Sequence, residues 1–458
     1  MKNTLGMFFF IAGIVLGPRV AQAQGQQPPA QNQQMPAQGQ QPQPQGQQPP
    51  GQPQALTLAD AEKIALANHP QIQTAQNLAL AAKEQTREVR SSYYPQASGS
   101  VTGAAAMPNS RIAAGGLNNP IIFDRESNGV LVGQLLTDFG RTHQLAKSSD
   151  YHAQAQQEAV VTSQADVLLG VDQAYFGVLK AQAVLQVAQE TVNDRQVVTN
   201  QVTAMARNQL KSDLDVTFAN VDLSQAQLLL IQAQNDLQAA FADLSTALGY
   251  ADQRTFTLSE VPVPQAPPMD LPGLIQQALQ NRPELVGERL DVNSAQSYAT
   301  AERDLYLPTV SALGAAGLTP AHAAQLDDRY AAAGVNINIP IFNGHLFGAL
   351  HSEAQFRAQA EQQRLRGLQD AIVRDVRTAW LNANSGYQRL SVTEQLLSQA
   401  TMSVNLAQAR YNLGLSSIVE LTQAQLNLTQ AQIAEASAKF DYETETSHLN
   451  YQVGNLHP

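Results

Sequence analysis

The stretch from Asp138 to Gly249 occurs twice in this chain, and this duplication constrains the fold more than any other feature. Adding 205 to a residue number in the first copy gives its counterpart, so that Val171 and Ala174 recur as Val376 and Ala379. No insertion interrupts the match. A period of this length is far longer than the repeats of solenoid proteins. The sequence therefore predicts two copies of one large structural unit.

Within each copy, apolar residues recur at alternating steps of three and four, the heptad spacing of helices that pack side by side. In the first copy this spacing links Ala219, Leu223, Ala226, Leu230, Ala233, Leu237, Ala240, Leu244 and Ala247. A second run of the same kind precedes it, and the polar segment between the two runs, Arg207 to Asp215, lacks the pattern. Each copy therefore predicts a long helical hairpin, whose alanines let neighbouring helices approach closely.

The first helix of the first hairpin is predicted to run from Arg141 to Arg207, about 100 Å at the usual rise per residue. Ordinary domain helices are far shorter. In the second copy, Glu435 and Glu445 interrupt the apolar spacing of the returning helix. Apolar seams of this length predict that something outside each hairpin packs against it.

Each copy opens with shorter helices that match at an offset of 213. Asn68-x-Pro70 recurs as Asn281-x-Pro283, and Tyr93-x-Pro95 recurs as Tyr306-x-Pro308. In the first copy we expect the helix to begin after Thr57, a residue type that caps helix N-termini, and to break at the first proline.

Four candidate strands follow these openings, at Gln96–Ala106, Ser127–Leu136, Thr309–Leu318 and Ala331–Ile341. Each has about ten residues, the length that a tilted strand needs to cross a bilayer. In the last strand, branched residues alternate with Asn336 and Asn338, and aromatic residues cluster at the strand ends, as in membrane β-barrels. Taken alone, the same pattern also fits a pair of soluble hairpins. The loops Met107–Glu126 and Thr319–Arg329 are expected to face the cell exterior.

The remaining segments set the domain boundaries. Residues 1–23 have the pattern of a secretory signal peptide, and residues 24–54 form a Gln- and Pro-rich leader that we predict to be disordered. Residues 55–257 make the first repeat and residues 273–455 the second. The Pro-rich connector between them, 258–272, is predicted to form neither a helix nor a central strand.

Composition excludes several classes of function. Only 14% of the residues are charged and 6% aromatic, and Gln, Asn, Ser and Thr take the place of charged residues. This composition suits surfaces that face other subunits or a water-filled lumen. The net charge of −11 argues against binding to nucleic acid. The chain has no cysteine, which excludes thiol chemistry and a lipid-modified N-terminal cysteine. His345 and His351 are six residues apart rather than the four of a helical zinc pair. We expect no catalytic site, metal or cofactor.

The order of these features resembles the outer membrane efflux protein (TolC-like) family. The paired Asn-x-Pro and Tyr-x-Pro motifs, the duplicated hairpin and the run Pro340-Ile341-Phe342-Asn343-Gly344 support the resemblance, which extends over about Leu56 to Gly454. The resemblance implies a mainly α-helical chain with membrane strands, acting as a homotrimer. Four strands from each of the three chains would close a 12-stranded β-barrel in the outer-membrane lipid, continued by an α-helical barrel in the periplasm.

The same resemblance implies a gate at the periplasmic tips of the hairpins. The second tip, from Arg410 to Glu420, is similar to the family pattern Arg-Tyr-x-x-Gly-x-x-Ser. It implies that Glu420 faces the pore and that Tyr411 and Asp215 form a closing hydrogen bond. Two residues depart from the family pattern, because Gln423 replaces a second acid of the pore and Ser416 replaces a latch arginine.

Two further roles are expected at the tips. As an alternative to a gate, Asp213 or Asp215 could simply cap the helix that follows the first tip. The resemblance also implies that a periplasmic adaptor docks on the tips, at Asn208, Gln209, Leu210, Lys211, Gly414, Leu415, Ser416 and Ser417.

The function expected from the resemblance is an outer-membrane exit channel for drugs or other small amphiphiles. An inner-membrane pump, of the RND or ABC type, would supply the energy. One alternative is an exit channel for a protein secreted by a type I system. Another is a structural coiled coil that spans the periplasm without forming a channel.

Overall fold

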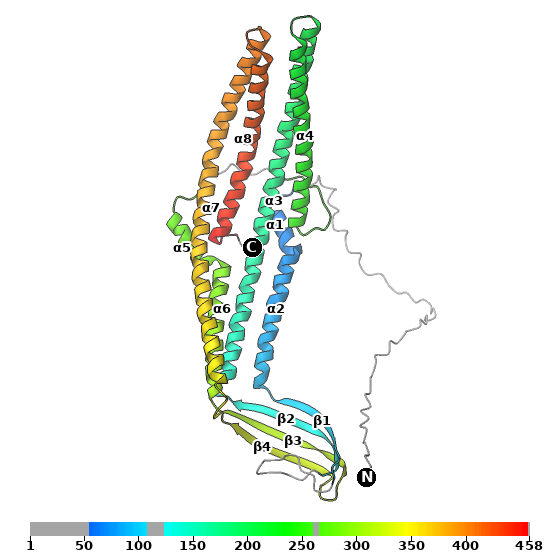
Figure 1. The fold of residues 1–458 in the computed structure, drawn as a ribbon, viewed down its shortest axis with the longest axis vertical. Helices are drawn as coiled ribbons and strands as arrows, with labels where there is room; N and C mark the ends of the chain where they lie inside the picture. The colour runs from blue at the N-terminus through cyan, green and yellow to red at the C-terminus, as the bar shows by residue number, and fades with distance from the viewer. Residues whose placement is uncertain (1–54, 108–122, 260–264, 457–458) are drawn as a thin grey trace, which may run out of the picture. The chain divides into compact units, whose positions relative to one another are not determined.

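The structure is a computed structural model that describes residues 55–107, 123–259 and 265–456. The predicted signal peptide, the leader and most of the first exterior loop lie outside these residues. The described residues belong to one compact unit, residues 53–458. Its two repeats have the same order of helices and strands (Figure 1).

The first repeat comprises α1 (Leu58–Asn68), α2 (Pro70–Arg90), β1 (Gln96–Ala104), β2 (Arg125–Thr137), α3 (Arg141–Arg207) and α4 (Asp213–Ala247). The second comprises α5 (Leu271–Asn281), α6 (Pro283–Arg303), β3 (Thr309–His322), β4 (Arg329–Asn338), α7 (Leu346–Asn412) and α8 (Ile418–Val453). Both α3 and α7 have 67 residues. The predicted bounds of the first long helix are therefore confirmed.

Local sequence explains where these helices begin. Thr57 caps α1, because its hydroxyl oxygen accepts the amide hydrogen of Asp60 at 3.2 Å. Pro70 breaks the first helix as predicted and opens α2, at a position where its missing N–H has no helical partner to lose. Between β2 and α3 the chain turns at Gly140, whose φ of 114° suits glycine, and Asp138 accepts the amide hydrogen of Gly140.

The four strands form one antiparallel sheet in the order β1-β2-β3-β4, so the pairing of β2 with β3 joins the two repeats. In the β3–β4 register, Asn336 and Asn338 lie opposite Ser311 and Thr309. The branched residues that alternate with these asparagines point to the other face of the sheet. One face is therefore polar near this end and the other apolar, as the alternation predicts.

Six of the eight strand bounds differ from the prediction. β2 runs from Arg125 to Thr137 rather than from Ser127 to Leu136, and β4 begins at Arg329 rather than Ala331. β1 ends at Ala104, two residues early. β3 continues to His322, because Thr319 donates its amide hydrogen to the Asp328 carbonyl at 2.8 Å inside the predicted loop. β4 ends at Asn338 rather than Ile341, since Pro340 has no N–H to donate to a neighbouring strand.

Helices from the two repeats lie side by side in a fixed order. Next to the sheet, α3 contacts α2 and α6, and α6 contacts α7; nearer the tips, α3 contacts α4 and α8, and α8 contacts α7 (Figure 1). The first repeat thus supplies one edge of the unit, formed by β1, α2 and α4. The second repeat supplies the other edge, formed by β4 and α7. Among the described residues, every helix is too short or too polar to cross a membrane.

The connector is fixed to both repeats by equivalent residues. The Tyr175 hydroxyl donates to the carbonyl of Leu56 or Ser259, at 2.9 and 3.1 Å. Its duplicate, Trp380, donates its indole N–H to the Pro268 carbonyl at 2.7 Å. The connector was predicted to be free of helix up to residue 272, and this was wrong, because α5 begins at Leu271 with a proline in its first turn.

Candidate gate at the helical tips

The two hairpins end in tips that share one capping chemistry. In the first tip, Ser212 caps α4, and Asp215 completes a capping box by accepting the amide hydrogen of Ser212 at 2.9 Å. In the second tip, the duplicate Ser417 caps α8 and accepts the amide hydrogen of Glu420 at 3.4 Å. The N-cap of α4 is therefore Ser212. The predicted alternative, that Asp213 or Asp215 caps this helix, is wrong.

Tyr411 lies at the centre of the tip region. Only 1% of its surface is exposed, within a cluster of Val202, Ala219, Ala407, Ile418, Leu421 and Ala424 that joins both hairpins. Burial, with a contribution from the charge of Asp215, raises the pKa of Tyr411 to about 12. The structure thus brings Tyr411 near Asp215, but the carboxylate binds Ser212 and the Tyr411 hydroxyl has no partner among the described residues.

Lys211 makes the contact that crosses from one tip to the other. Its ammonium group lies 3.7 Å from the centroid of the Tyr411 ring and donates to the Tyr411 carbonyl at 3.0 Å. Next to it, the Gln201 amide donates to Asn412 at 3.2 Å. Sequence analysis placed Lys211 in the docking surface only. The only sequence feature that pointed to Lys211 was its position in the first tip. Comparison of the two repeats gave no further support, because the duplicate position holds Ser416.

The other predicted gate residues are more exposed. Glu420 forms an ion pair with Arg410 at 3.2 Å, and each side chain remains nearly half exposed. Gln423 donates to Asn427 one turn further along α8. Asp213 lies exposed in the first turn of α4. The structure therefore places these three residues in the first two turns of the helices that leave the tips.

The predicted docking residues form the ends of both tips. Leu210 is 71% exposed and Leu415 is 66% exposed, so each tip presents a large apolar side chain to solvent. Gln209 and Gly414 adopt positive φ angles of 61° and 72° where the chain reverses. The remaining predicted residues of this surface are Asn208, Lys211, Ser416 and Ser417, of which Lys211 and Ser417 make the contacts described above.

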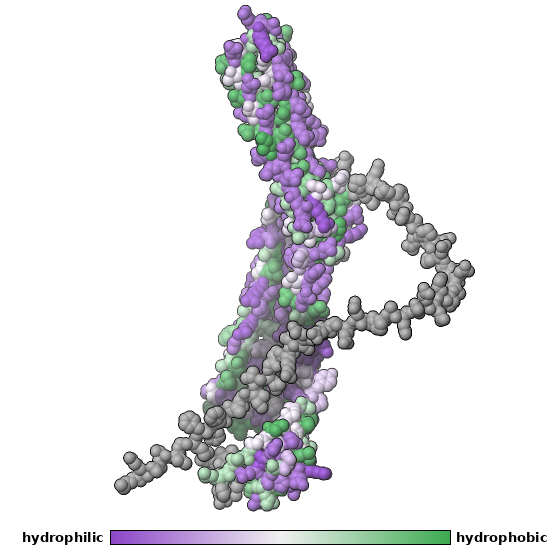
Figure 2. Space-filling view, turned by 90° about the vertical axis from the view of Figure 1, so that its right-hand side faces the viewer, coloured by the Kyte–Doolittle hydropathy of each residue, from purple (hydrophilic) through white to green (hydrophobic). Residues whose placement is uncertain are grey.

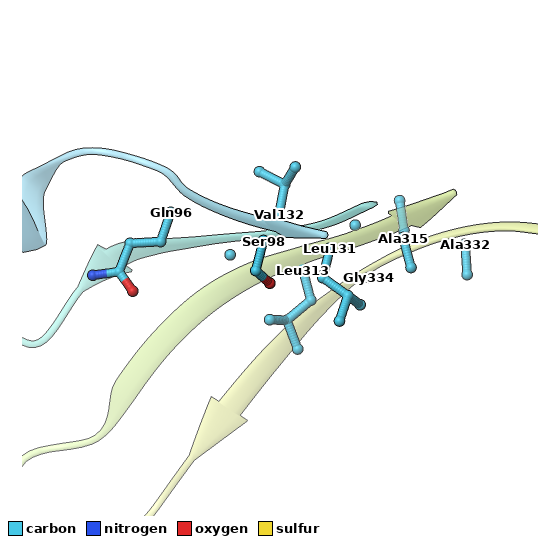
Figure 3. A pocket seen from close by; sticks show the side chains of 11 residues that line it. Gln96, Ser98, Leu131, Val132, Leu313, Ala315, Ala332 and Gly334 are labelled. Carbon is cyan, nitrogen blue, oxygen red and sulfur yellow. The ribbon is translucent and has the colours of Figure 1, made fainter. Parts of the chain in front are cut away.

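The sheet has a hollow on one face. A cavity of about 570 Å³ is lined by Gln96 and Ser98 of β1, and by small or branched residues of the other strands. Figure 3 shows Leu131 and Leu313 on the same side of the sheet, with Val132 on the opposite side. In the described part of the chain, no group of three or more His, Cys, Asp or Glu side chains could hold a metal ion.

Comparisons with known proteins agree with this architecture. The family model described as "Outer membrane efflux protein" matches residues 63–250 and 274–455, one match for each repeat. Outer membrane protein TolC of Salmonella enteritidis is 23% identical over 350 residues, which are 72% of this chain and 71% of that protein. Cation efflux system protein CusC of Escherichia coli (strain K12) is 24% identical over 379 residues, 80% of this chain and 79% of that protein.

A solved structure shares the fold. The Campylobacter jejuni CmeC outer membrane channel superposes with a TM-score of 0.75 at 15% identity, over 87% of this chain and 86% of that one. The repeated unit, its sheet and its two long hairpins are therefore those of a known channel fold. Because the family model matches both repeats over most of the chain, this chain belongs to the outer membrane efflux protein family.

Proposed function

We propose that three copies of this chain close into a channel that carries small amphiphiles, such as drugs, out across the outer membrane. As a member of its family the chain is an outer-membrane efflux protein and not an enzyme. A closed ring is supported best by the way in which the two repeats form the two opposite edges of the chain. At every level, from sheet to tips, the first repeat forms one edge and the second repeat forms the other.

The strands at these edges need partners. β1 and β4 each pair on one side only, and an unpaired strand edge in lipid leaves backbone N–H and C=O groups without hydrogen bonds. Pairing β4 of one copy with β1 of the next satisfies both edges. The number of copies, three, comes from the resemblance to TolC-like proteins, and it gives a 12-stranded barrel.

The helical edges also expose apolar residues that a neighbouring copy would cover. On α4 the exposed row is Leu214, Phe218, Val221, Leu228 and Ile231. On α7 it includes Leu381, Val392, Leu396, Met402 and Leu406. Figure 2 views the edge that carries α4 and shows hydrophobic patches on a largely hydrophilic surface. Heptad-spaced rows on α4 and α7 favour packing between α4 of one copy and α7 of the next.

The tips would act as the gate of this channel. In the present arrangement Lys211 holds Tyr411, and Asp215 lies near enough to become a second partner when the tips move. Glu420 of three copies would bring three carboxylates together near the axis, which favours cations. The exposed leucines at the tips would bind the adaptor, and the pump in the inner membrane would supply the energy.

Small solutes are favoured over a secreted protein as cargo. CusC, which is about as similar to this chain as TolC is, is named for cation efflux. A relative from Cupriavidus metallidurans is named for cobalt-zinc-cadmium resistance. A structural coiled coil without a channel would need no hollow, uncharged face on its sheet, such as the one beside Gln96 and Ser98.

Conductance tests this function directly. Purified protein in a planar lipid bilayer should give stepwise ion currents, and detergent-solubilised protein should have the mass of three copies. Deleting the gene should lower resistance to several amphiphilic drugs while leaving secreted proteins unchanged. Trimers without any current would contradict the channel, and loss of one secreted protein with unchanged drug resistance would favour type I secretion.

A further inference from the structure

In the first repeat, an extended segment that follows α4 folds back and covers that helix. We call residues 253–259 the covering segment. The backbone of Arg254 exchanges two hydrogen bonds with the Ser245 hydroxyl, which accepts from the Arg254 N–H at 2.9 Å and donates to its carbonyl at 3.3 Å. The Gln253 side chain donates to the Gln238 carbonyl at 3.1 Å. Ser245 is only 2% exposed beneath this segment.

The far end of the covering segment pairs with the residue that leads into α1. The Leu56 amide donates to the Thr257 carbonyl at 2.7 Å, and the Ser259 amide donates to the Leu56 carbonyl at 3.0 Å. This is a short parallel pairing. Phe256 and Leu258 pack against the core of the repeat. The first repeat thus fills a groove on its own α4 with one extended piece of its own chain.

The equivalent position on α8 is an open groove. Adding 205 converts Gln238 into Glu443 and Ser245 into Asn450. Both of these α8 residues line a cavity of about 420 Å³ between the helix and residues 265–268 of the connector, which we call the connector groove. Asn450 is exposed, although its counterpart Ser245 is buried. The second repeat therefore keeps the groove but leaves its floor open to solvent.

Met269 shows the same lack of cover at the other end of the groove. It is the counterpart of Leu56 at the offset of 213, and it is 95% exposed, whereas Leu56 packs against the core of the first repeat. Trp380 has one acceptor in the connector, whereas its duplicate Tyr175 reaches a second acceptor, Ser259, in the covering segment. Among the described residues, no segment takes the place of the covering segment in the second repeat.

The differences between the two grooves indicate the chemistry of an occupant. Glu443 replaces Gln238, and it is the only charged residue among those that line the connector groove. A carboxylate accepts hydrogen bonds and cannot donate them, so it favours a cation at the place of Gln253. Apolar residues three and five positions later would take the places of Phe256 and Leu258.

We propose that the connector groove binds an extended segment of a second periplasmic protein, in which Lys or Arg is followed by apolar residues three and five positions later. The backbone of this segment would pair with Met269 as the covering segment pairs with Leu56, the mode in which an added strand extends an exposed edge. From Ile418 to Asn450, α8 spans about 50 Å, so the groove is separate from the leucines of the tips. This inference does not depend on the channel proposed above.

A labelled peptide tests the groove. The probe is a synthetic peptide with the sequence of residues 252–259 carrying Gln253→Lys, and fluorescence anisotropy measures its binding to the purified full-length protein in detergent. One peptide should bind per chain, because the first repeat covers its own groove. The unchanged peptide should bind about fivefold more weakly, the upper end for losing a partly exposed ion pair.

Variants of α8 locate the binding. Glu443→Gln restores the side chain of the first repeat, so the two peptides should then bind equally. Glu435→Gln makes the same change at an exposed position of α8 outside the groove, and it should keep the fivefold preference. Asn450→Trp fills the groove and should weaken binding of either peptide at least tenfold. Because Asn450 is exposed, this variant should unfold at the same temperature as the wild-type protein.

The possible outcomes separate this inference from the proposed function. It is overturned if the Gln253→Lys peptide does not bind at millimolar concentration, or if Glu443→Gln and Asn450→Trp leave its binding unchanged. Binding to single chains but not to trimers would show that a neighbouring copy covers the groove, which also overturns it. Peptide binding by a protein that gives no ion current would refute the channel and leave this inference standing.

Discussion

Lys211 is the residue whose replacement should change the closed state most. It stabilises Tyr411 through a cation–π contact and a hydrogen bond, which together contribute about 1–3 kcal/mol at a half-buried site. We expect Lys211→Ala to raise resting conductance about tenfold or more. Lys211→Arg, which keeps the cation and a donor, should stay close to wild type. Equal conductance of the two variants would contradict a role for the contact in closure.

Asp172 should make the stability of the chain depend on pH. It is 2% exposed on α3, and burial raises its pKa to about 7, with the neighbouring charge of Glu62 adding to the rise and a hydrogen bond from Ser447 opposing it. The folded chain therefore holds a proton that the unfolded chain releases near its ordinary pKa. Stability should fall as pH rises from about 4 to about 7 and then level off.

Asp172→Asn tests this dependence, because the amide can keep the bond to Ser447 without a charge. Thermal unfolding at pH 8 should move to higher temperature in the variant, whereas at pH 4 the two proteins should unfold together. Glu62→Gln removes the like charge and should lower the pKa of Asp172, so that the fall in stability ends at a lower pH. Parallel pH curves for Asp172→Asn and the wild-type protein would show that Asp172 is not the group that titrates.

The sequence suggested candidate gate residues at the tips but not all of their contacts. Tyr411, Asp215 and Glu420 became candidates because the duplication aligns the two tips and one tip resembles a family motif. The contact of Lys211 with Tyr411 joins residues 200 positions apart. No local pattern encodes such a contact. The capping box of Ser212 with Asp215, by contrast, is a local pattern that the sequence contains. The prediction considered only the acids as caps and not the serine.

Within α7, two glycines should respond to the same substitution with opposite signs. A side chain at Gly386 would overlap the carboxylate of Glu445, which is held by Arg389 at 2.5 Å, whereas Gly367 has no neighbouring atom within 4 Å. Gly367→Ala should stabilise the helix by about 0.5–1 kcal/mol, since glycine is a poor helix former. Gly386→Ala should destabilise it by about 1–3 kcal/mol through overpacking.

Thermal unfolding of the two variants in detergent measures this difference. The contact also explains why Glu445 can interrupt the apolar spacing of α8. Gly386 on the facing helix has no side chain and so leaves space for the carboxylate. Adding Glu445→Ala to Gly386→Ala should restore most of the lost stability. Equal shifts for both glycine variants would mean that Glu445 moves aside without cost.

Long helices were the most predictable elements and strand ends the least. The bounds of α3 follow from local signals, a glycine turn at one end and a polar tip at the other. The ends of β1, β3 and β4 depend on which residues of a neighbouring strand offer hydrogen bonds. That information lies in the pairing, so the sequence predicted the four strands but misplaced six of their eight bounds.

At the scale of the whole molecule, the duplication explains why the chain is incomplete by itself. Two copies of one unit lie side by side, and the contact of α3 with α8 in the middle has no equivalent at the outer edges, where α7 and α4 remain exposed. Repeating the internal contact between chains gives a ring. The sequence predicted that the seams need cover, but the identity of the edge helices required the packing order.

Charges on the α4 edge should therefore prevent assembly. Val221 and Leu228 are one heptad apart and 49% and 67% exposed in the single chain. Val221→Asp with Leu228→Asp would bury two carboxylates between copies, which costs several kcal/mol unless they are paired. We expect the purified variant to have the mass of one copy in detergent and to give no conductance. Val197→Asp, at a residue of α3 that is 65% exposed and away from both edges, should still form conducting trimers. A trimer that survives both edge charges would mean that copies meet along another face, because a carboxylate left in water disturbs nothing.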